Sequence, residues 1–411
     1  MKWMMPRSPS AIVAGGLCTG CGLCEALDSS GTCKMKIDTQ GFLRPHGVES
    51  IAQADQQKIM NACPGVHVHP IHQDRASSHP RHPQWGDINQ CLVGWSSDEV
   101  LRKQGASGGA LSAICQFLIE SKEVNFIIQI GADNRRPLRN VIHTSRSVEQ
   151  IKHNAGSRYA PSAPLSTISE LLDRGERFGV VGKPCDIAGL RNLAKHDHRV
   201  DQCIPYMLSF FCAGLPSYLG TSRLLARMEA VEHDVTSFRY RGNGWPGFAS
   251  AEQVDGTVKQ MSYDESWGQV LNRHLQYRCK ICPDGVGSLA DIACADAWYQ
   301  DEHGNPCFNE REGRSLILSR NEKGNSILNE MMSQGYLIAS SFDSEQIAPI
   351  QSHQARRKAL AWSRILAMKT LFRRVPDFSG MALLANCHSV SFIQLFKSYV
   401  GCLLRLTRMS R

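Results

Sequence analysis

The sequence predicts an α/β protein, with an α+β core built on a mixed sheet, a small cysteine-rich N-terminal module and a helical C-terminal tail. Three observations support this prediction. Between about residues 89 and 345, apolar strand-like runs alternate with amphipathic helical segments and glycine turns. Three cysteines crowd residues 18–24, and the chain becomes basic and helical after about Gln351.

The composition is that of a globular protein with one unusual feature. The 411 residues are 42% hydrophobic and 20% charged, which suits two or three domains with a real core. The sixteen cysteines fit either a secreted disulfide framework or an intracellular metalloprotein. Residues 1–18 have a short apolar run and no clear cleavage site. We therefore expect a reducing cytoplasm and cysteines that bind metal.

The net charge of +8 is a mild and diffuse excess. It is compatible with an acidic protein partner, a phosphorylated cofactor or an anionic membrane surface. No Lys/Arg run with interleaved aromatic residues is present, so we expect no nucleic-acid partner. No stretch approaches 18 uninterrupted apolar residues, so we expect no membrane-spanning helix.

Residues 12–65 form the predicted N-terminal module. They begin with a C-x2-C-x2-C pattern made by Cys18, Cys21 and Cys24, which opens the cluster loop of bacterial ferredoxins. The fourth thiol of that loop is replaced by Asp28, leaving Cys33 and Cys63 as substitutes. We favour Cys63 because a proline follows it, as is common at iron–sulfur ligands. The pattern predicts a ferredoxin-like [4Fe–4S] module; three buried or zinc-binding thiols are the alternative.

Residues 66–88 are predicted to be a His/Pro-rich linker at a domain boundary. The alternative is a metal site made from the histidines of this stretch, which are His67, His69, His72, His79 and His82.

Two glycine-containing segments in the core are candidate ligand loops. The first, GASGG, leads into a helix whose N-terminal N–H groups would suit a phosphate, although such turns often only connect two elements and bind no ligand. Its candidate residues are Gly105, Ser107, Gly108 and Gly109. The second segment could bind an anion or stack on a ring, although without other evidence its sequence predicts an ordinary loop. Its candidates are Gly156, Ser157, Arg158 and Tyr159.

Four further thiols come from three places in the core. Cys185 and Cys212 each lie in a turn after a predicted strand, a usual place for ligand-binding groups in open α/β folds. Cys279 and Cys282 form a CxxC pair followed by proline, within the stretch 277–298 that also holds Asp291 and Asp296. A CxxC pair serves zinc sites, redox disulfides and clusters, and a lone cysteine in a turn is often inert. Together the four thiols make the number that a [4Fe–4S] cluster needs.

These motifs, in this order, resemble the beta-subunit family of coenzyme F-420 (deazaflavin) hydrogenases and dehydrogenases. The resemblance covers roughly residues 18–345 and rests on GASGG, GSRY, VGKPCDIAGLR, FFCAGLPS, FRYRGNGWPG and RCKICPDGVGSLADIACADAW. The family is related to 7-hydroxymethyl chlorophyll a reductase and vinyl reductases. Its members carry FAD and a [4Fe–4S] cluster on an α/β core, and many add an N-terminal ferredoxin-like module.

The resemblance implies roles for specific residues. A core cluster would be held by Cys185, Cys212, Cys279 and Cys282. The two glycine-containing segments would contact FAD, with Asp296 and Trp298 near the site. The chain departs from the family in reading KPC where TPC is familiar, and in placing a thiol at Cys294, which we expect to be buried rather than a ligand.

Two other segments leave alternatives open. Arg239, Arg241 and Trp245 in FRYRGNGWPG suit an anionic planar partner, or equally a hairpin pinned by the tryptophan. The amphipathic segment 391–408 suits a peripheral membrane contact, although a helix docked on the core or on a partner is the simpler expectation.

The resulting functional hypothesis is an iron–sulfur flavoprotein, an FAD-dependent oxidoreductase. A ferredoxin or another electron-carrier protein would deliver electrons through two [4Fe–4S] clusters to FAD and on to an organic small-molecule acceptor. Residues 89–345 would form the reductase core and 346–411 a basic helical region. No His/Ser/Asp set predicts hydrolysis, and no catalytic residue is identified. The alternatives are a non-catalytic electron-transfer subunit of a larger complex and a zinc-stapled binding protein.

Overall fold

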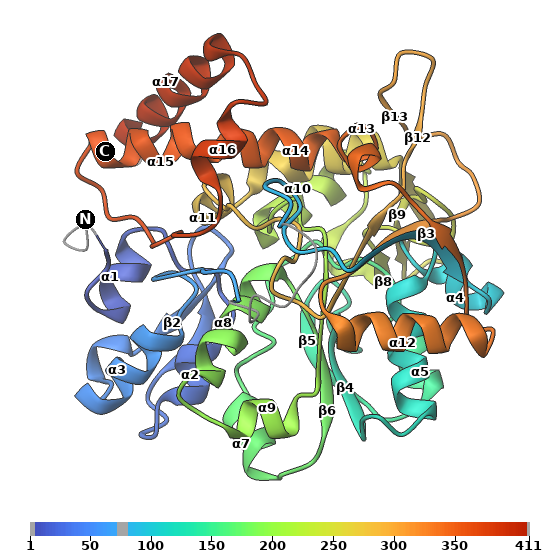
Figure 1. The fold of residues 1–411 in the computed structure, drawn as a ribbon, viewed down its shortest axis with the longest axis horizontal. Coiled ribbons are helices and arrows are strands. Elements are labelled where there is room, and N and C mark those ends of the chain that lie inside the picture. The colour runs from blue at the N-terminus through green and yellow to red at the C-terminus, as the bar shows by residue number, and fades with distance from the viewer. Residues whose placement is uncertain (1–4, 72–80, 409–411) are drawn as a thin grey trace.

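The computed structural model describes residues 5–71 and 81–408. An eight-stranded mixed sheet lies at its centre, in the order β15-β3-β14-β11-β7-β6-β4-β5 (Figure 1). The strands are β3 (Gln90–Ser96), β4 (Phe126–Ala132), β5 (Asn140–Ser145), β6 (Phe178–Gly182), β7 (Tyr206–Phe210), β11 (Ile292–Asp296), β14 (Ser315–Ser319) and β15 (Leu337–Ser341). The central strands β4, β6, β7 and β11 pair in parallel, and the outer pairs are antiparallel. The predicted α/β fold with a mixed sheet is confirmed.

Helices cover both faces of the parallel strands, which explains their nearly continuous apolar sequences. On β4, Phe126 and Ile128 join the core on one face, whereas Ile127 joins the core on the other. The first face packs on α7 (Ile168–Asp173), α8 (Pro184–Ala194) and α9 (Arg199–Cys203). The second packs on α5 (Ala110–Glu120), α6 (Val148–His153) and α12 (Glu322–Ser333), beside the short α4 (Glu99–Gln104).

The N-terminal segment packs against the central sheet layer through a shared apolar core. Its elements are α1 (Pro9–Ala14), α2 (Leu23–Leu27), β1 (Lys34–Ile37), β2 (Leu43–His46), a 3-10 turn (Val48–Ser50) and α3 (Gln53–Ala62). Leu17 and Leu23 are buried in the same cluster as Ile187 and Leu190 of α8. The Ser169 hydroxyl donates to the Ala26 carbonyl at 2.6 Å. The segment is therefore built into the body of the protein.

The predicted linker 66–88 is described at both ends, and neither end is solvated chain. Val68 donates its N–H to the Asp377 carbonyl at 2.9 Å, and Asp377 donates back to Val66 at 2.7 Å. Trp85 is fully buried and stacks on Phe211 with ring centroids 6.1 Å apart. Both ends are therefore held against the body of the protein. Of its histidines, His67, His69 and His82 are described, whereas His72 and His79 lie outside the described residues.

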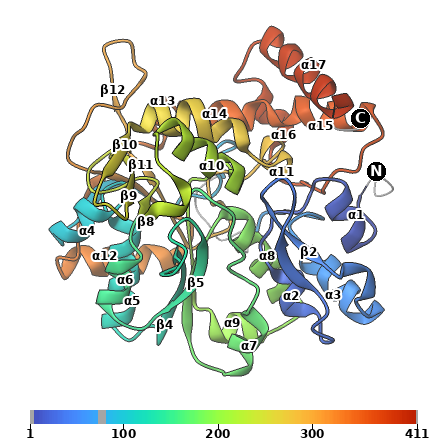
Figure 2. The ribbon, with the colours of Figure 1, turned by 180° about the vertical axis from the view of Figure 1, so that it is seen from behind.

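Smaller elements surround the central sheet (Figures 1 and 2). Above one edge are α10 (Tyr218–Arg227), a three-stranded meander of β8 (Val235–Arg239), β9 (Ala249–Gln253) and β10 (Val258–Met261), a π-helix (Asp264–Val270), a 3-10 turn (Leu271–His274) and α11 (Tyr277–Lys280). A 3-10 turn also precedes β8 (Glu232–Asp234). The hairpin of β12 (Tyr299–Gln300) and β13 (Pro306–Cys307) projects from the body.

The C-terminal region is made mainly of helices. After a 3-10 turn (Ser344–Gln346) it contains α13 (Ile347–Ile350), α14 (Ser352–Ala359), α15 (Ala361–Thr370), α16 (Leu383–Cys387) and α17 (Phe392–Arg408). Helices α15 and α17 lie side by side in both views (Figures 1 and 2). Within residues 5–71 and 81–408, no helix is long and apolar enough to cross a membrane.

One buried carboxylate joins several of these elements. Asp291, 1% exposed, lies just before β11. Its Oδ1 accepts from Arg191 Nη2 on α8 at 2.9 Å and from Asn321 Nδ2 at 2.6 Å, and its Oδ2 accepts from the Met207 N–H on β7 at 2.7 Å. Burial opposes the charge, but Arg191 and Lys323 outweigh it and lower the pKa of Asp291. The carboxylate therefore ties α8, β7 and the start of α12 together.

Replacing Asp291 by Asn tests this network. The variant leaves Arg191 and Lys323 facing a neutral group, so we expect a loss of about 2–4 kcal/mol in the free energy of unfolding. Because the folded pKa is lowered, this contribution is present above the ordinary aspartate pKa and is lost as pH falls through the folded pKa. The difference from wild type should thus be constant between about pH 6 and 8.

Urea unfolding followed by circular dichroism measures the change. The control is Asp201→Asn on the exposed surface of α9, which should stay within about 0.5 kcal/mol of wild type. An equal loss in both variants would contradict a special role for Asp291.

Candidate functional site

A cavity of about 440 Å³ opens at the carboxyl ends of the central parallel strands. Its wall includes Gly182 at the end of β6, Phe210 at the end of β7 and Asp296 at the end of β11. This is the edge at which open α/β sheets bind ligands. Both glycine-containing segments predicted from the sequence reach it.

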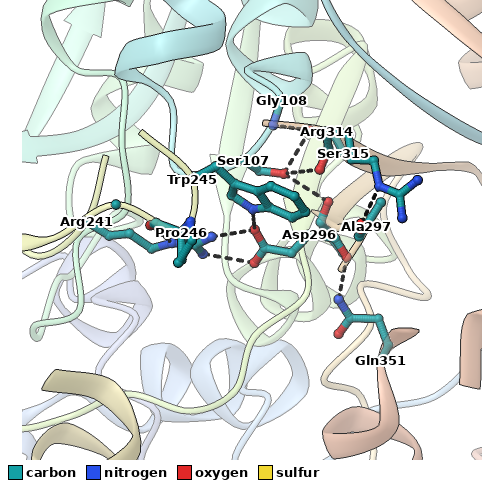
Figure 3. Close-up of polar contacts among 12 residues, drawn as sticks. Ser107, Gly108, Arg241, Trp245, Pro246, Asp296, Ala297, Arg314, Ser315 and Gln351 are labelled. Atoms are coloured by element: carbon teal, nitrogen blue, oxygen red, sulfur yellow. Dashed lines mark hydrogen bonds and ion pairs between the residues drawn. The ribbon is translucent and has the colours of Figure 1, made fainter. Parts of the chain in front are cut away.

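The GASGG turn lies over this cavity. Gly105, Ser107 and Gly109 line it, followed by Ala110, Leu111 and Ser112 in the first turn of α5. The first amides of an α-helix have no acceptor within the helix, so this turn offers N–H groups to a ligand. The Ser107 hydroxyl itself bonds to the Arg314 carbonyl at 2.9 Å and to Ser315 Oγ at 3.0 Å (Figure 3). Its side chain therefore holds the turn rather than facing a ligand.

Gly108 is the one predicted residue of this turn that does not line the cavity. Its N–H donates to Ser315 Oγ at 3.0 Å. A Cβ on Gly108 would lie 2.8 Å from both the Gly94 carbonyl oxygen and the Ser315 nitrogen. Glycine is required here because the turn packs directly against the backbones of β3 and β14.

The second segment, residues 156–159, forms another wall. Gly156 has a φ of 117°, a conformation that favours glycine. Arg158 donates to the carbonyls of Phe238, Pro137 and Arg139 and to Asn140, at 2.8–3.2 Å. Burial lowers the pKa of Arg158. Its guanidinium is thus engaged in building the wall, which disfavours the anion-binding alternative for this residue.

Asp296 is the centre of a hydrogen-bonded group at the end of β11 (Figure 3). Arg241 donates to both of its carboxylate oxygens, at 2.6 and 2.9 Å, and Trp245 Nε1 donates at 2.7 Å. Burial opposes the charge of Arg241, but the Asp296 carboxylate outweighs it and raises the pKa of Arg241. Of the two readings of this segment, the structure supports a hairpin pinned by Trp245, with Arg241 neutralised internally.

Aromatic side chains form the outer wall of the cavity. Trp298 stacks on Trp245 with centroids 4.9 Å apart and an 8° angle, and its other ring contacts include Tyr263 and Phe308. Trp267 lies 4.9 Å from Tyr159. Tyr263, Trp267, Trp298 and Phe308 all line the cavity. Tyr263 and Trp267 belong to no motif in the sequence, so only the fold reveals them.

A buried ion pair that sequence reasoning missed also faces the cavity. Lys183 Nζ lies 2.7 Å from Asp186 Oδ2, and both side chains are at least nine-tenths buried. Burial opposes the charge of Lys183, but Asp186 and the nearby Cys185 and Cys212 thiols outweigh it and raise the pKa of Lys183. Asp186 Oδ1 has no hydrogen-bond partner among the described residues. It is therefore an acceptor open to a ligand N–H or O–H.

The first predicted thiol set is brought together beside α3. Burial raises the pKa of Cys24, and the neighbouring thiols of Cys63, Cys18 and Cys21 raise it further. Cys33 instead lies beside the Asp28 carboxylate, which accepts the Cys33 N–H at 2.7 Å. Its raised pKa of about 11 comes from burial, Asp28 and Glu25. Cys63 has Cys24, Cys21 and Cys18 as thiol neighbours, and Cys33 also has Cys24 and Cys18 nearby. The choice of Cys63 as the fourth thiol stays a prediction.

The second predicted thiol set adjoins the cavity. Burial raises the pKa of Cys212 to about 12, with Cys279 and Cys282 as thiol neighbours, and Cys185 has both Cys212 and Cys282 nearby. The Arg357 guanidinium donates to the carbonyls of Cys212 at 2.7 Å and Cys279 at 2.9 Å. Three distant parts of the chain that carry these thiols, together with Arg357 of α14, thus meet at one edge of the sheet.

Cys294 lies outside this second set. It is buried in the apolar core beside Cys115, and burial raises its pKa to about 12. This position agrees with the expected buried thiol. All sixteen cysteines are free of disulfides. In the described part of the chain, no three His, Cys, Asp or Glu side chains converge around a single metal ion.

Arg278 connects the two thiol sets. Its side chain is buried, and its Nη2 donates to the carbonyl of Pro64, the residue after Cys63, at 3.1 Å. Its guanidinium stacks over Phe378 at 5.0 Å, and the next residue in the chain is Cys279. The positive charge opposes the burial that raises the pKa of Cys63 and of Cys282. One cation therefore acts on both sets.

The fold and the cavity define an α/β protein with a ligand-sized cavity at the carboxyl ends of the parallel strands of a mixed sheet. The fold is similar to a chain of the F420-reducing [NiFe] hydrogenase complex from Methanosarcina barkeri, with a TM-score of 0.59 and 18% identity, covering 73% of this chain and 99% of that one. Residues 91–169 and 175–345 match the N-terminal and C-terminal models of the coenzyme F420 hydrogenase/dehydrogenase beta subunit. The chain belongs to this family.

Characterised relatives are distant in sequence. The beta subunit of coenzyme F420 hydrogenase from Methanococcus voltae is 24% identical over 266 residues, which cover 63% of this chain and 86% of that protein. The coenzyme F420-dependent sulfite reductase of Methanocaldococcus jannaschii is 23% identical over 77% of this chain. The match spans 46% of the length of that reductase.

Substituting Gly108 by Ala tests how the glycine turn is held. The added Cβ would overlap backbone atoms of β3 and β14, so we expect a loss of about 1–3 kcal/mol in unfolding free energy. The matched control is Gly401→Ala in α17, where no atom lies within 4 Å of the added Cβ. That control should be neutral or stabilised by up to about 1 kcal/mol. If both variants unfolded at the same temperature as wild type, the claim that Gly108 is closely packed would be contradicted.

Proposed function

We propose that this protein is an iron–sulfur flavoprotein that passes electrons from a carrier protein to an organic acceptor. The observation that carries the proposal is the arrangement of two four-thiol sets on either side of Arg278, the second of them next to the cavity. In this proposal Cys18, Cys21, Cys24 and Cys63 hold one [4Fe–4S] cluster. Cys185, Cys212, Cys279 and Cys282 hold the other.

The chemistry of each donor set fits a cluster. Four free thiols lie together in each set, which is the ligand number of a [4Fe–4S] centre. Burial raises the pKa of most of these thiols, so metal-free thiolates would be costly there. Ligation to iron would stabilise the thiolates. N–H groups also point at sulfur, including Gly65 toward Cys63 at 3.3 Å and Leu215 toward Cys279 at 3.4 Å.

The cavity fits FAD by its chemistry. The first turn of α5 would receive a phosphate, and Tyr159 and Trp267 offer aromatic faces. The unpartnered Asp186 Oδ1 would accept from a ring N–H or a hydroxyl. Gly105, Ser107, Gly109, Gly156, Ser157 and Asp296 line the same space. In this arrangement Arg158, Gly108 and Asp296 hold the walls in place through contacts within the protein.

When bound, these groups would supply one-electron carriers and a flavin that delivers electrons in pairs. The chain itself would shield the thiol sets from water and place the second set at the cavity wall. The aromatic residues Tyr263, Trp298 and Phe308 would receive a planar acceptor at the outer wall. A deazaflavin is one acceptor class consistent with the names of the relatives.

A second candidate function is an electron-transfer subunit without an acceptor of its own. It is favoured by the structural neighbour, which is one chain of a hydrogenase complex. This function predicts bound cofactors but no turnover with any small acceptor unless a partner enzyme is added.

The deciding measurement is made on protein purified without oxygen. Iron, acid-labile sulfide, zinc and flavin are assayed on one sample together with a visible spectrum. We expect about eight irons and one FAD per chain. Zinc with neither iron nor flavin would overturn the proposal in favour of a zinc-stapled protein. Eight irons without flavin would overturn the FAD assignment alone.

Single cysteine variants test the ligand assignment. Cys63→Ala and Cys185→Ala should each lose one cluster and retain about four irons. Their matched controls are Cys33→Ala and Cys294→Ala, also buried thiols, which should retain about eight irons. The assignment of the first set is wrong if Cys33→Ala loses iron and Cys63→Ala does not.

Replacing Arg278 by Gln tests the link between the two thiol sets. Removing a cation that faces both sets should lower both cluster potentials, by roughly 30–60 mV for these one-electron couples. The control is Arg364→Gln, which removes a donor to the carbonyl of Lys280 in the CxxC pair at 2.7 Å. It should affect the second cluster alone. Redox titration followed by electron paramagnetic resonance gives the values, and an unchanged first cluster in Arg278→Gln would contradict the link.

A further inference from the structure

The net positive charge of the protein comes from its C-terminal region. Eleven of the 46 basic residues but one of the 38 acidic residues follow Gln351, so residues 352–411 carry a net charge of +10 and the rest of the chain −2. The one acidic residue is Asp377. Its carboxylate accepts a hydrogen bond from the Ser379 hydroxyl, and His69 Nε2 lies 3.1 Å from it. The excess of +8 is therefore regional rather than diffuse.

Helix α17 has an inner face fixed to the body of the protein. Cys402 and Leu406 are buried, and the Tyr277 hydroxyl lies 3.5 Å from Cys402 Sγ. Arg364 Nε of α15 donates to Ser398 Oγ at 3.1 Å. These contacts set which side of the helix faces outward.

The outer face of α17 carries bulky apolar side chains. Phe392 is 79% exposed, Ile393 64%, Phe396 56% and Leu404 56%. Phe392 and Phe396 lie one turn apart with ring centroids at 6.4 Å. Exposed Lys397 follows Ile393 by one turn, and exposed Arg405 follows Leu404. Helix α17 lies at the edge of the molecule in both views, above α15 (Figures 1 and 2).

We propose that the outer face of α17 docks on an anionic lipid bilayer. A helix of this kind lies in the interface, with its aromatic and aliphatic residues at the boundary of headgroups and acyl chains and its cations near lipid phosphates. Charge complementarity favours this occupant, because α17 presents the exposed cations Lys397 and Arg405 and contains no acidic residue. Other cations of the region face inward: Lys358 is buried, and Arg357 and Arg364 bind interior carbonyls. An acidic carrier protein would match the cations but would leave four protruding apolar side chains to be covered.

The docked helix would also approach the predicted cluster region. Tyr277 and Lys280 border the CxxC pair and contact α17 and α15 respectively. A membrane-bound position would thus bring the second thiol set close to the bilayer. This docking stands apart from the proposed electron transfer, since it rests on exposed residues and charge alone.

The test is co-sedimentation of the full-length, oxygen-free protein with lipid vesicles. Vesicles of phosphatidylcholine are compared with vesicles containing phosphatidylglycerol, at low and high salt. We expect binding only to the anionic vesicles, weakened by salt. A triple variant, Phe392→Ser with Ile393→Ser and Phe396→Ser, should lose at least about tenfold in affinity. Lys397→Glu with Arg405→Glu should also lose at least about tenfold.

Matched controls use exposed residues on other elements. Val254→Ser on the β9–β10 turn, 75% exposed, controls for apolar exposure. Lys36→Glu with Arg223→Glu controls for charge reversal. Both controls should bind as wild type does. Absence of binding to anionic vesicles, or equal losses in controls and α17 variants, would overturn the proposal. Binding to an acidic ferredoxin but not to vesicles would overturn it in favour of a protein partner.

Discussion

Gathering eight thiols in two adjacent sets within the protein is the constraint on which the rest of the structure depends. Thiolates are poorly stabilised at such depth, and neighbouring thiols repel one another when charged. The chain meets this constraint with cations that it also buries. Arg278 lies between the sets, Lys183 lies beside Cys185, and Arg357 holds the carbonyls of Cys212 and Cys279. Each of these cations is itself held by carbonyl groups, a carboxylate or both.

The mixed sheet provides the positions from which these groups meet. The parallel strands β6, β7 and β11 end at one edge, so the turns after β6 and β7 deliver Cys185 and Cys212 there. The same edge presents Asp296, whose carboxylate organises Arg241 and Trp245 into the cavity wall. Because one edge supplies both the thiols and the cavity, the distance between a metal centre and a ligand would be set by strand register. Register in a buried parallel sheet is strongly specified.

The sequence predicts which cysteines belong to the candidate site better than it predicts the residues that line the cavity around them. Cysteine spacing predicts the C-x2-C-x2-C thiols and the CxxC pair, and the proline after Cys63 favours it over Cys33, because these signals are local. Cys185 and Cys212 join the second predicted set through their place after strands and through the family resemblance. Tyr263 and Trp267 reach the cavity only through tertiary contacts, so no local pattern could indicate them. For Gly108 the local pattern is misleading. Its motif suggests a ligand contact, whereas a glycine is needed there because the turn packs closely against Gly94 and Ser315. The His/Pro-rich composition of residues 66–88 resembles a linker, but Val66 and Trp85 bury their side chains.

The C-terminal helices join the chemistry of the site to the surface of the molecule. Arg357 of α14 binds the carbonyl of Cys279, and Arg364 of α15 binds the carbonyl of the next residue, Lys280. Tyr277, two residues before the CxxC pair, contacts Cys402 of α17. A shift of α17 would therefore be felt at α11, because these contacts are short and buried. The region that carries the net positive charge of the chain is thus also the region that contacts the CxxC segment.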